Sequence, residues 1–138
     1  MRFYCPRCWQ DFDKDLSRCP YCGLDIHGFW KSKDYVEKLI VALNHPEPET
    51  PIRAAWLLGE LKDPRAVEPL IRLIKYTEDV YIAQAAVEAL GKFETPESLH
   101  FLDTLVHHPV KMVRDTVLQI LASRNRHRPS TEKGKENV

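Results

Sequence analysis

Four cysteines within the first 22 residues of the 138-residue chain are the side chains best suited to chemistry. They form two Cys-Pro-x-Cys pairs, separated by ten residues. The two-residue gap inside each pair lets both thiolates of one turn reach the same ion at about 2.3 Å, and two such turns supply four sulfur ligands to a closed tetrahedral site. The spacing therefore predicts one structural Zn(II) ion, bound by Cys5, Cys8, Cys19 and Cys22.

Three other uses of paired cysteines stay open from the sequence. Two disulfides would stabilise a short segment, although a reducing compartment disfavours them. Rubredoxin-type iron uses similar turns, but with a longer gap between them. A thioredoxin-like redox centre needs a strand and a helix that an aromatic-rich stretch of 31 residues does not provide. Zinc is favoured because so short a segment buries too little apolar area to fold alone, and metal binding supplies the missing free energy.

The cysteine pairs resemble the knuckles of zinc ribbons. That resemblance implies a residue with positive φ after the second cysteine of each knuckle, and Gly23 suits this place. Trp9 stands at the equivalent place after Cys8, where positive φ would strain its side chain, so the first knuckle is expected to be irregular. Trp9, Phe12 and Trp30 are expected to form the core of this module and to dock it onto the first helix that follows, with base stacking as the alternative.

The charges exclude some binding partners. The 20 Lys and Arg residues equal the 20 Asp and Glu residues, so no global field attracts nucleic acid or an anionic membrane. Apolar runs stay far short of the roughly 20 residues of a membrane span, and the start of the chain lacks the apolar stretch of a secretory signal. We therefore expect a cytoplasmic protein that does not bind membranes. A nucleic-acid-associated module, using the zinc ribbon and a basic tail, is an alternative.

The elements that must position these groups follow from an internal repeat. Ala54-Ala55-Trp56-Leu57-Leu58-Gly59 and Ala86-Val87-Glu88-Ala89-Leu90-Gly91 lie 32 positions apart. A period of this length, with apolar residues at helical spacing, indicates paired helices in a repeat protein. Helices are predicted at residues 33–44, 51–61, 65–76, 80–93, 97–107 and 110–123. The predicted fold class is all-α: a short right-handed α-solenoid of about three helix pairs, preceded by the small zinc ribbon.

Prolines and glycines predict where these helices begin and how they pack. Four prolines are expected at first helical positions, in the pairs Thr50-Pro51, Asp63-Pro64, Thr95-Pro96 and His108-Pro109. Pro69 lies inside the third helix, which is therefore expected to open with a 3-10 turn and to become regular at Pro69. Gly59 and Gly91 permit either a close approach of neighbouring helices or an early stop. The predicted domains are residues 1–31, residues 32–124 and a disordered tail at 125–138.

Residues 54–71 and 86–99 resemble HEAT-type repeats of the class first described in phycobilisome lyases. The resemblance implies stacked helix pairs, but such repeats occur in lyases, scaffolds and nucleic-acid proteins alike. No Ser-His-Asp set, phosphate-binding loop or pair of inward carboxylates can be placed, so no enzymatic activity is expected. The predicted function is a non-enzymatic adaptor or scaffold for protein–protein interaction. An accessory or maturation factor resembling the lyases is a further alternative.

The second helix of each pair is expected to line the concave side and to bind a protein or peptide. Its polar positions carry mixed charges rather than the two or three basic groups per layer that a phosphate backbone would require. This predicted partner face consists of Glu37, Glu68, Arg72, Lys75, His100, Thr104 and His107. His45, His107 and His108 are expected to be residues of helix ends, close to the C-terminal dipole.

Overall fold

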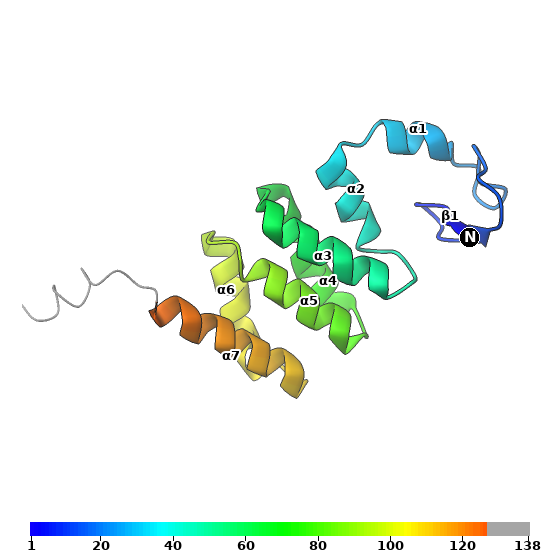
Figure 1. Ribbon diagram of the computed structural model, residues 1–138. Helices are drawn as coiled ribbons and strands as arrows, with labels where there is room; N and C mark the ends of the chain where they lie inside the picture. The colour runs from blue at the N-terminus through cyan, green and yellow to red at the C-terminus, as the bar shows by residue number, and fades with distance from the viewer. Residues whose placement is uncertain (127–138) are drawn as a thin grey trace, which may run out of the picture.

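A stack of helices in two layers follows a small cysteine-containing module (Figure 1). The computed structural model describes residues 1–126. The first two residues of the predicted tail at 125–138 belong to the last helix, and the rest of that tail lies outside the described range. The module contains the antiparallel strands β1 (Phe3–Tyr4) and β2 (Asp11–Phe12) and the short helix α1 (Ile26–Lys31). The stack consists of α2 (Tyr35–Ala42), α3 (Glu49–Leu61), α4 (Val67–Tyr76), α5 (Val80–Leu90), α6 (Pro96–Thr104) and α7 (Lys111–Arg126). The 3-10 turns η1 (Pro64–Ala66) and η2 (Leu105–His107) adjoin α4 and α6, and the predicted fold class is confirmed.

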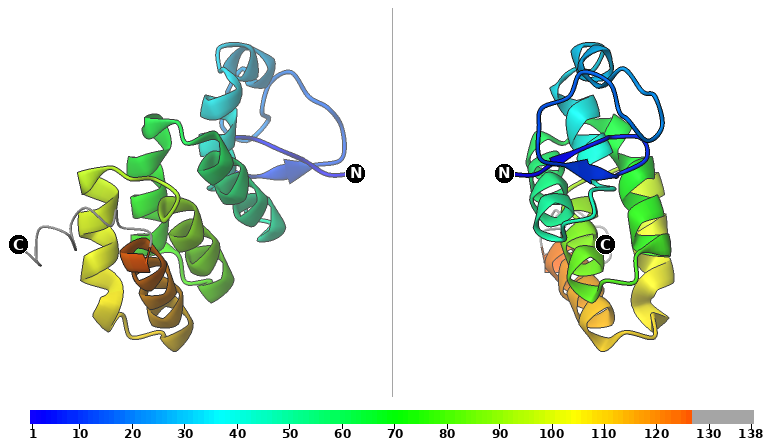
Figure 2. Two further views of the ribbon diagram at one scale, coloured as in Figure 1. Left: turned by 60° about the vertical axis from the view of Figure 1, so that its left-hand side comes forward. Right: turned by 90° about the vertical axis from the view of Figure 1, so that its right-hand side faces the viewer.

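Two glycines let the helices of one layer approach each other closely. The first layer consists of α3, α5 and α7, and the second of α2, α4 and α6 (Figure 2). A Cβ atom at Gly59 would lie 3.0 Å from the Cα atom of Ala89 on α5. At Gly91 it would lie 2.8 Å from the Cδ1 atom of Ile120 on α7. Close helix approach is therefore observed at both glycines, and the early stop is observed at Gly91, because α5 ends at Leu90 with Gly91 as its C-cap.

The second layer is packed more loosely than the first, since α4 and α6 are in less contact than α3 and α5. The second helices α2, α4 and α6 lie together in this layer, and the expectation that they line the concave side stays a prediction.

The repeat period is visible in contacts between equivalent residues. Arg65 Nη1 donates to Asp34 Oδ2 at 2.8 Å, and these residues stand 31 positions apart. Across the first layer, Gln84 Nε2 lies 3.4 Å from the hydroxyl of Thr116, 32 positions further on. Both pairs join one repeat to the next at the same register, so the predicted period of 31 to 32 residues is confirmed.

Two predicted helix caps are observed, and each satisfies a backbone N–H group that has no acceptor within its helix. The Asp63 carboxylate accepts from the Arg65 N–H at 3.0 Å, at the start of η1. The Thr95 hydroxyl accepts from the Ser98 N–H at 3.2 Å, at the start of α6. None of the helices within residues 1–126 has the length and hydropathy of a membrane span.

Several predicted helix starts differ from the observed ones by one or two residues. The helix α3 begins at Glu49, so Thr50 lies inside it rather than capping it, and α7 begins only at Lys111, beyond Pro109. The 3-10 turn before α4 is observed, but the α-helix begins at Val67 and not at Pro69. Pro69 is tolerated there because it stands in the first turn, where backbone N–H groups have no acceptor within the helix.

Substitution of a repeat leucine tests the predicted register. Leu90 is fully buried, and Leu90→Ala should lower the free energy of unfolding by about 2–5 kcal/mol because it removes core contacts and leaves a cavity. Leu118 on α7, 50% exposed, is the matched control, and its change to alanine should cost less than about 1 kcal/mol. Urea unfolding followed by circular dichroism measures both. Equal effects of the two substitutions would show that the register is wrong.

Candidate metal centre

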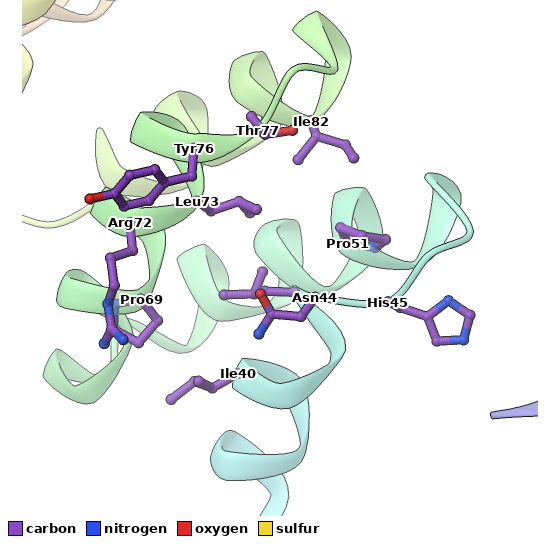
Figure 3. Close-up of a pocket in the computed structure, with 11 residues that line it drawn as sticks. Ile40, Asn44, His45, Pro51, Pro69, Arg72, Leu73, Tyr76, Thr77 and Ile82 are labelled. Carbon is purple, nitrogen blue, oxygen red and sulfur yellow. The ribbon is translucent and has the colours of Figure 1, made fainter. Parts of the chain in front are cut away.

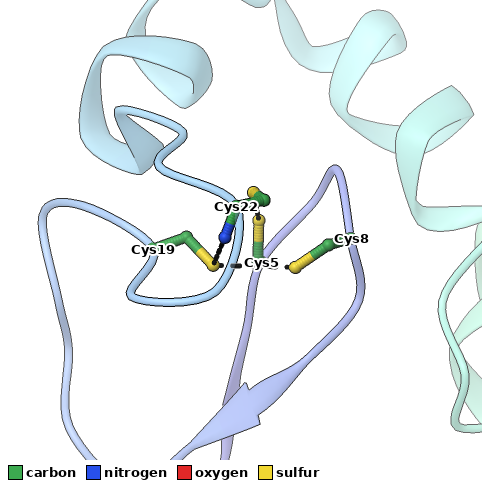
Figure 4. A group of neighbouring side chains, drawn as sticks. All are labelled: Cys5, Cys8, Cys19 and Cys22. Carbon is green, nitrogen blue, oxygen red and sulfur yellow. Dashed lines mark hydrogen bonds between the residues drawn. The ribbon is translucent and has the colours of Figure 1, made fainter.

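The four cysteine sulfurs lie together at the tips of two turns (Figure 4). All four are within 4.8 Å of one another, with Cys5 Sγ 3.5 Å from Cys22 Sγ and Cys8 Sγ 3.6 Å from Cys19 Sγ. A tetrahedral ion with metal–sulfur bonds of about 2.3 Å separates its sulfurs by about 3.8 Å. A disulfide needs about 2.05 Å, and all four cysteines are free, so the disulfide alternative is wrong. The donor set fits a metal ion.

Both turns have the same backbone geometry. The Trp9 N–H donates to the Cys5 carbonyl at 2.9 Å, and the Gly23 N–H donates to the Cys19 carbonyl at 2.9 Å. Trp9 has φ 61° and Gly23 has φ 81°, so the tryptophan adopts the conformation of a glycine. The prediction of an irregular first knuckle is therefore wrong. The turn keeps its form and Trp9 bears the strain, of about 1–2 kcal/mol for a residue with a Cβ atom.

The four thiols need a nearby cation if all of them are to ionise together. The backbone N–H of Leu24 lowers the pKa of Cys22 to about 6. Although the backbone N–H of Gln10 opposes the shift, burial and hydrogen bonds from neighbouring thiols raise the pKa of Cys8 to about 12. Near neutral pH the set is therefore partly protonated on its own. A divalent cation among the sulfurs would hold all four as thiolates, which is the form that binds soft metals.

The module docks onto the loop between α2 and α3 through aromatic rings. The His45 ring lies edge-on to Tyr4, with centroids 4.4 Å apart, and to Trp9, with centroids 5.3 Å apart. The Tyr4 hydroxyl donates to Glu47 Oε1 at 2.7 Å. Phe12 is buried in the module's own core, and Trp30 packs against that core. Of the three aromatics predicted to build the core and dock the module, Trp9 alone contacts this loop, and the docking site follows α2 instead of lying on it.

His45 is held in its neutral form by its surroundings. Its Nδ1 atom accepts from the Glu47 N–H at 3.0 Å, so this nitrogen carries no proton. Burial lowers the pKa of His45, and the negative charge of Glu47 only partly opposes this shift. Sequence analysis missed His45, Tyr4 and Glu47 as functional residues. No motif links them, because Tyr4 and Glu47 stand 43 positions apart.

The predicted partner face lies on the second layer of helices. Glu37 on α2 is half-buried, whereas Glu68, Arg72 and Lys75 on α4 are exposed. On α6 and η2 the exposed members of the face are His100, Thr104 and His107. The structure thus places all seven residues on α2, α4, α6 and η2, and their role in partner binding stays a prediction.

The two layers of paired helices define an α-solenoid repeat protein. A family model of HEAT repeats matches residues 36–122, which is more than half of the chain. The chain therefore belongs to the HEAT-repeat family. A comparison with curated proteins gives no match. The family match begins after the cysteine-containing module, whose likeness to zinc ribbons rests on its two knuckles.

Metal content tests the cysteine site. The purified protein should hold one zinc ion, and Cys5→Ser or Cys19→Ser should release it and unfold residues 1–30 while the helices of the stack remain. Elemental analysis and hydrogen exchange measure these effects, and exchange should also rise at residues 43–48 because docking is lost. His27→Ala is the control, since His27 contacts Asp15 at 3.1 Å and is no part of the sulfur cluster. Iron, or free thiols without metal, would contradict the zinc prediction.

Two substitutions of Trp9 separate backbone strain from ring contact. Trp9→Ala and Trp9→Gly both remove the contact with His45, but only glycine relieves the strain of positive φ. The Trp9→Gly variant should be more stable than the Trp9→Ala variant by about 1 kcal/mol, which corresponds to about fivefold tighter zinc binding. Competition with a chromophoric chelator measures the difference. Equal zinc affinities would show that Trp9 is unstrained.

Proposed function

We propose that the protein is a non-enzymatic adaptor, in which a zinc-stabilised module is fixed to one end of a HEAT solenoid that binds a protein or peptide. The observation that carries this proposal is the set of exposed charges on α4. Within the described part of the chain, no ion pair involves Glu68, Arg72 or Lys75. One acidic group followed by two basic ones along the helix is available to a partner of mixed charge, and such groups set specificity and association rate.

The zinc ion has a structural role in this proposal. Cys5, Cys8, Cys19 and Cys22 would hold it, and four protein ligands leave no open position for a substrate or an activated water. Backbone N–H groups support the sulfurs: the Arg7 N–H donates to Cys5 Sγ at 3.4 Å, and the Tyr21 N–H donates to Cys19 Sγ at 3.4 Å. Such hydrogen bonds orient thiolate ligands and stabilise their charge.

The arginines of the module favour a protein partner over nucleic acid. Arg7 donates to the Cys22 carbonyl at 2.8 Å, and Arg18 donates to the Gly23 carbonyl at 2.6 Å. Arg2 pairs with Asp11 at 2.6 Å. These three guanidinium groups are engaged within the module, so few cations remain for phosphate groups, which supply most of the affinity for nucleic acid.

Charge reversal tests the partner face. Glu68→Lys, Arg72→Glu and Lys75→Glu together should abolish capture of the partner, because they invert the field of the exposed face of α4. The melting temperature should shift by only a few degrees, since the three side chains are exposed and make no ion pair, and the contact of Lys75 Nζ with the Phe101 ring, 5.7 Å to the centroid, is a weak one at an exposed site. Co-purification from lysate of the native host, quantified by mass spectrometry, measures capture.

A matched control reverses charges on the other layer. Glu88→Lys, Arg53→Glu and Lys111→Glu change the net charge by the same amount on α3, α5 and α7, where all three residues are exposed. Lys111 also pairs with Asp115 at 2.6 Å, an exposed contact whose loss costs about 0.3–0.5 kcal/mol. This variant should capture the partner normally. Unchanged capture by the α4 variant would move the binding site away from the second layer, and loss in both variants would show a nonspecific charge effect.

A further inference from the structure

A groove opens in the second layer between the ends of α2 and α4 (Figure 3). Its volume is about 420 Å³. Ile40 and Leu43 line it from the α2 side, and Pro69 and Leu73 line it from α4. Apolar walls of this size suit one or two side chains of an extended segment, since ligand pockets of about 300–1,000 Å³ hold small molecules and anchor residues.

The groove follows from the way in which the two helices are joined. Asp34 caps the start of α2, and its carboxylate pairs with Arg65. Arg65 lies in η1, the 3-10 turn that leads into α4. This contact holds the first turns of α2 and α4 together. The groove runs from Pro69, in the first turn of α4, to Asn44 and Tyr76 near the C-terminal ends of the two helices.

Polar groups in the groove select a negatively charged ligand. Arg72 lines it, and no aspartate or glutamate does, although acidic residues outnumber basic ones within residues 32–124. Glu68 stands one turn before Arg72 on α4, yet no ion pair joins them in the described residues. Asn44 adds amide donors, and Tyr76, 78% exposed, adds a ring and a hydroxyl. A guanidinium group binds a carboxylate through two parallel hydrogen bonds, which makes it selective for that group.

We propose that this groove binds an extended protein segment in which a glutamate or aspartate side chain stands next to a leucine-like side chain. The carboxylate pairs with Arg72 and accepts from Asn44, and the aliphatic group packs between Ile40 and Leu73. The proposal rests on the adaptor function and names the chemistry that its partner must present. A nucleic acid is disfavoured because the groove offers one arginine, whereas phosphate backbones require several cations.

Binding of defined peptide pools tests the proposal. The probes are fluorescein-labelled hexapeptides with four randomised flanking positions around a central Glu-Leu, Gln-Leu, Glu-Ser or Gln-Ser pair. By fluorescence anisotropy, the full-length protein should bind the Glu-Leu pool about tenfold tighter than the Gln-Leu or Glu-Ser pools. Arg72→Gln should remove the preference for Glu over Gln and leave the preference for Leu over Ser. Arg53→Gln, at an exposed position on α3 outside the groove, is the control and should retain both preferences.

Three results would overturn the groove proposal: equal binding of the Glu-Leu and Gln-Leu pools, an unchanged preference in Arg72→Gln, or tighter binding of a dT15 oligonucleotide that Arg72→Gln abolishes. The melting temperature of Arg72→Gln should match that of the parent protein, because Arg72 is exposed and unpaired, so lost folding cannot mimic lost binding. Partner capture that is lost in the α4 charge reversal but unchanged in Arg72→Gln refutes the groove and keeps the adaptor function. Unchanged capture in both the α4 charge reversal and Arg72→Gln refutes the partner face itself.

Discussion

The close approach of α3, α5 and α7 is the constraint on which the rest of the structure depends. Helices come this near only where one of them lacks a side chain, and Gly59 and Gly91 supply that gap at equivalent places. Because the first layer is drawn together, the second layer is left more open. The groove between α2 and α4 lies in this more open layer, and so do the exposed charges of α4.

The module depends on a second balance, between metal binding and backbone strain. Trp9 at positive φ costs about 1–2 kcal/mol, whereas structural zinc sites of this kind contribute about 10–16 kcal/mol to folding. A zinc ion at this site would therefore outweigh the strain severalfold, so the turn could retain a tryptophan where glycine would be easier. What the tryptophan adds is a ring that reaches His45. The module and the stack have separate buried clusters. The contacts of His45 with Trp9 and with Tyr4 join these two parts.

Sequence reasoning succeeded where the signal is local or periodic and failed where it is not. The cysteine spacing predicted the sulfur cluster, and the 32-residue period predicted the helix pairs, because each depends on residues close in sequence or at a fixed interval. The conformation of Trp9 was missed because a propensity rule was applied to a turn whose hydrogen bonds override it. The role of His45 depends on contacts between distant segments, which carry no motif.

His45 belongs to both the docking contact and the groove, and this shared residue limits how strongly the two can influence each other. Two edge-on aromatic pairs contribute about 0.5–1.5 kcal/mol each, and the hydrogen bond from Tyr4 to Glu47 adds about 1 kcal/mol. The docking contacts thus hold His45, at one wall of the groove, with a free energy that exceeds about 1.4 kcal/mol. A free energy of that size corresponds to a tenfold change in affinity. Coupling free energies are reciprocal, so a groove ligand can strengthen metal binding only by the amount that the metal strengthens the groove. Since that amount is small beside the free energy that a structural zinc ion would contribute, such an ion would stay bound whether or not the groove is occupied.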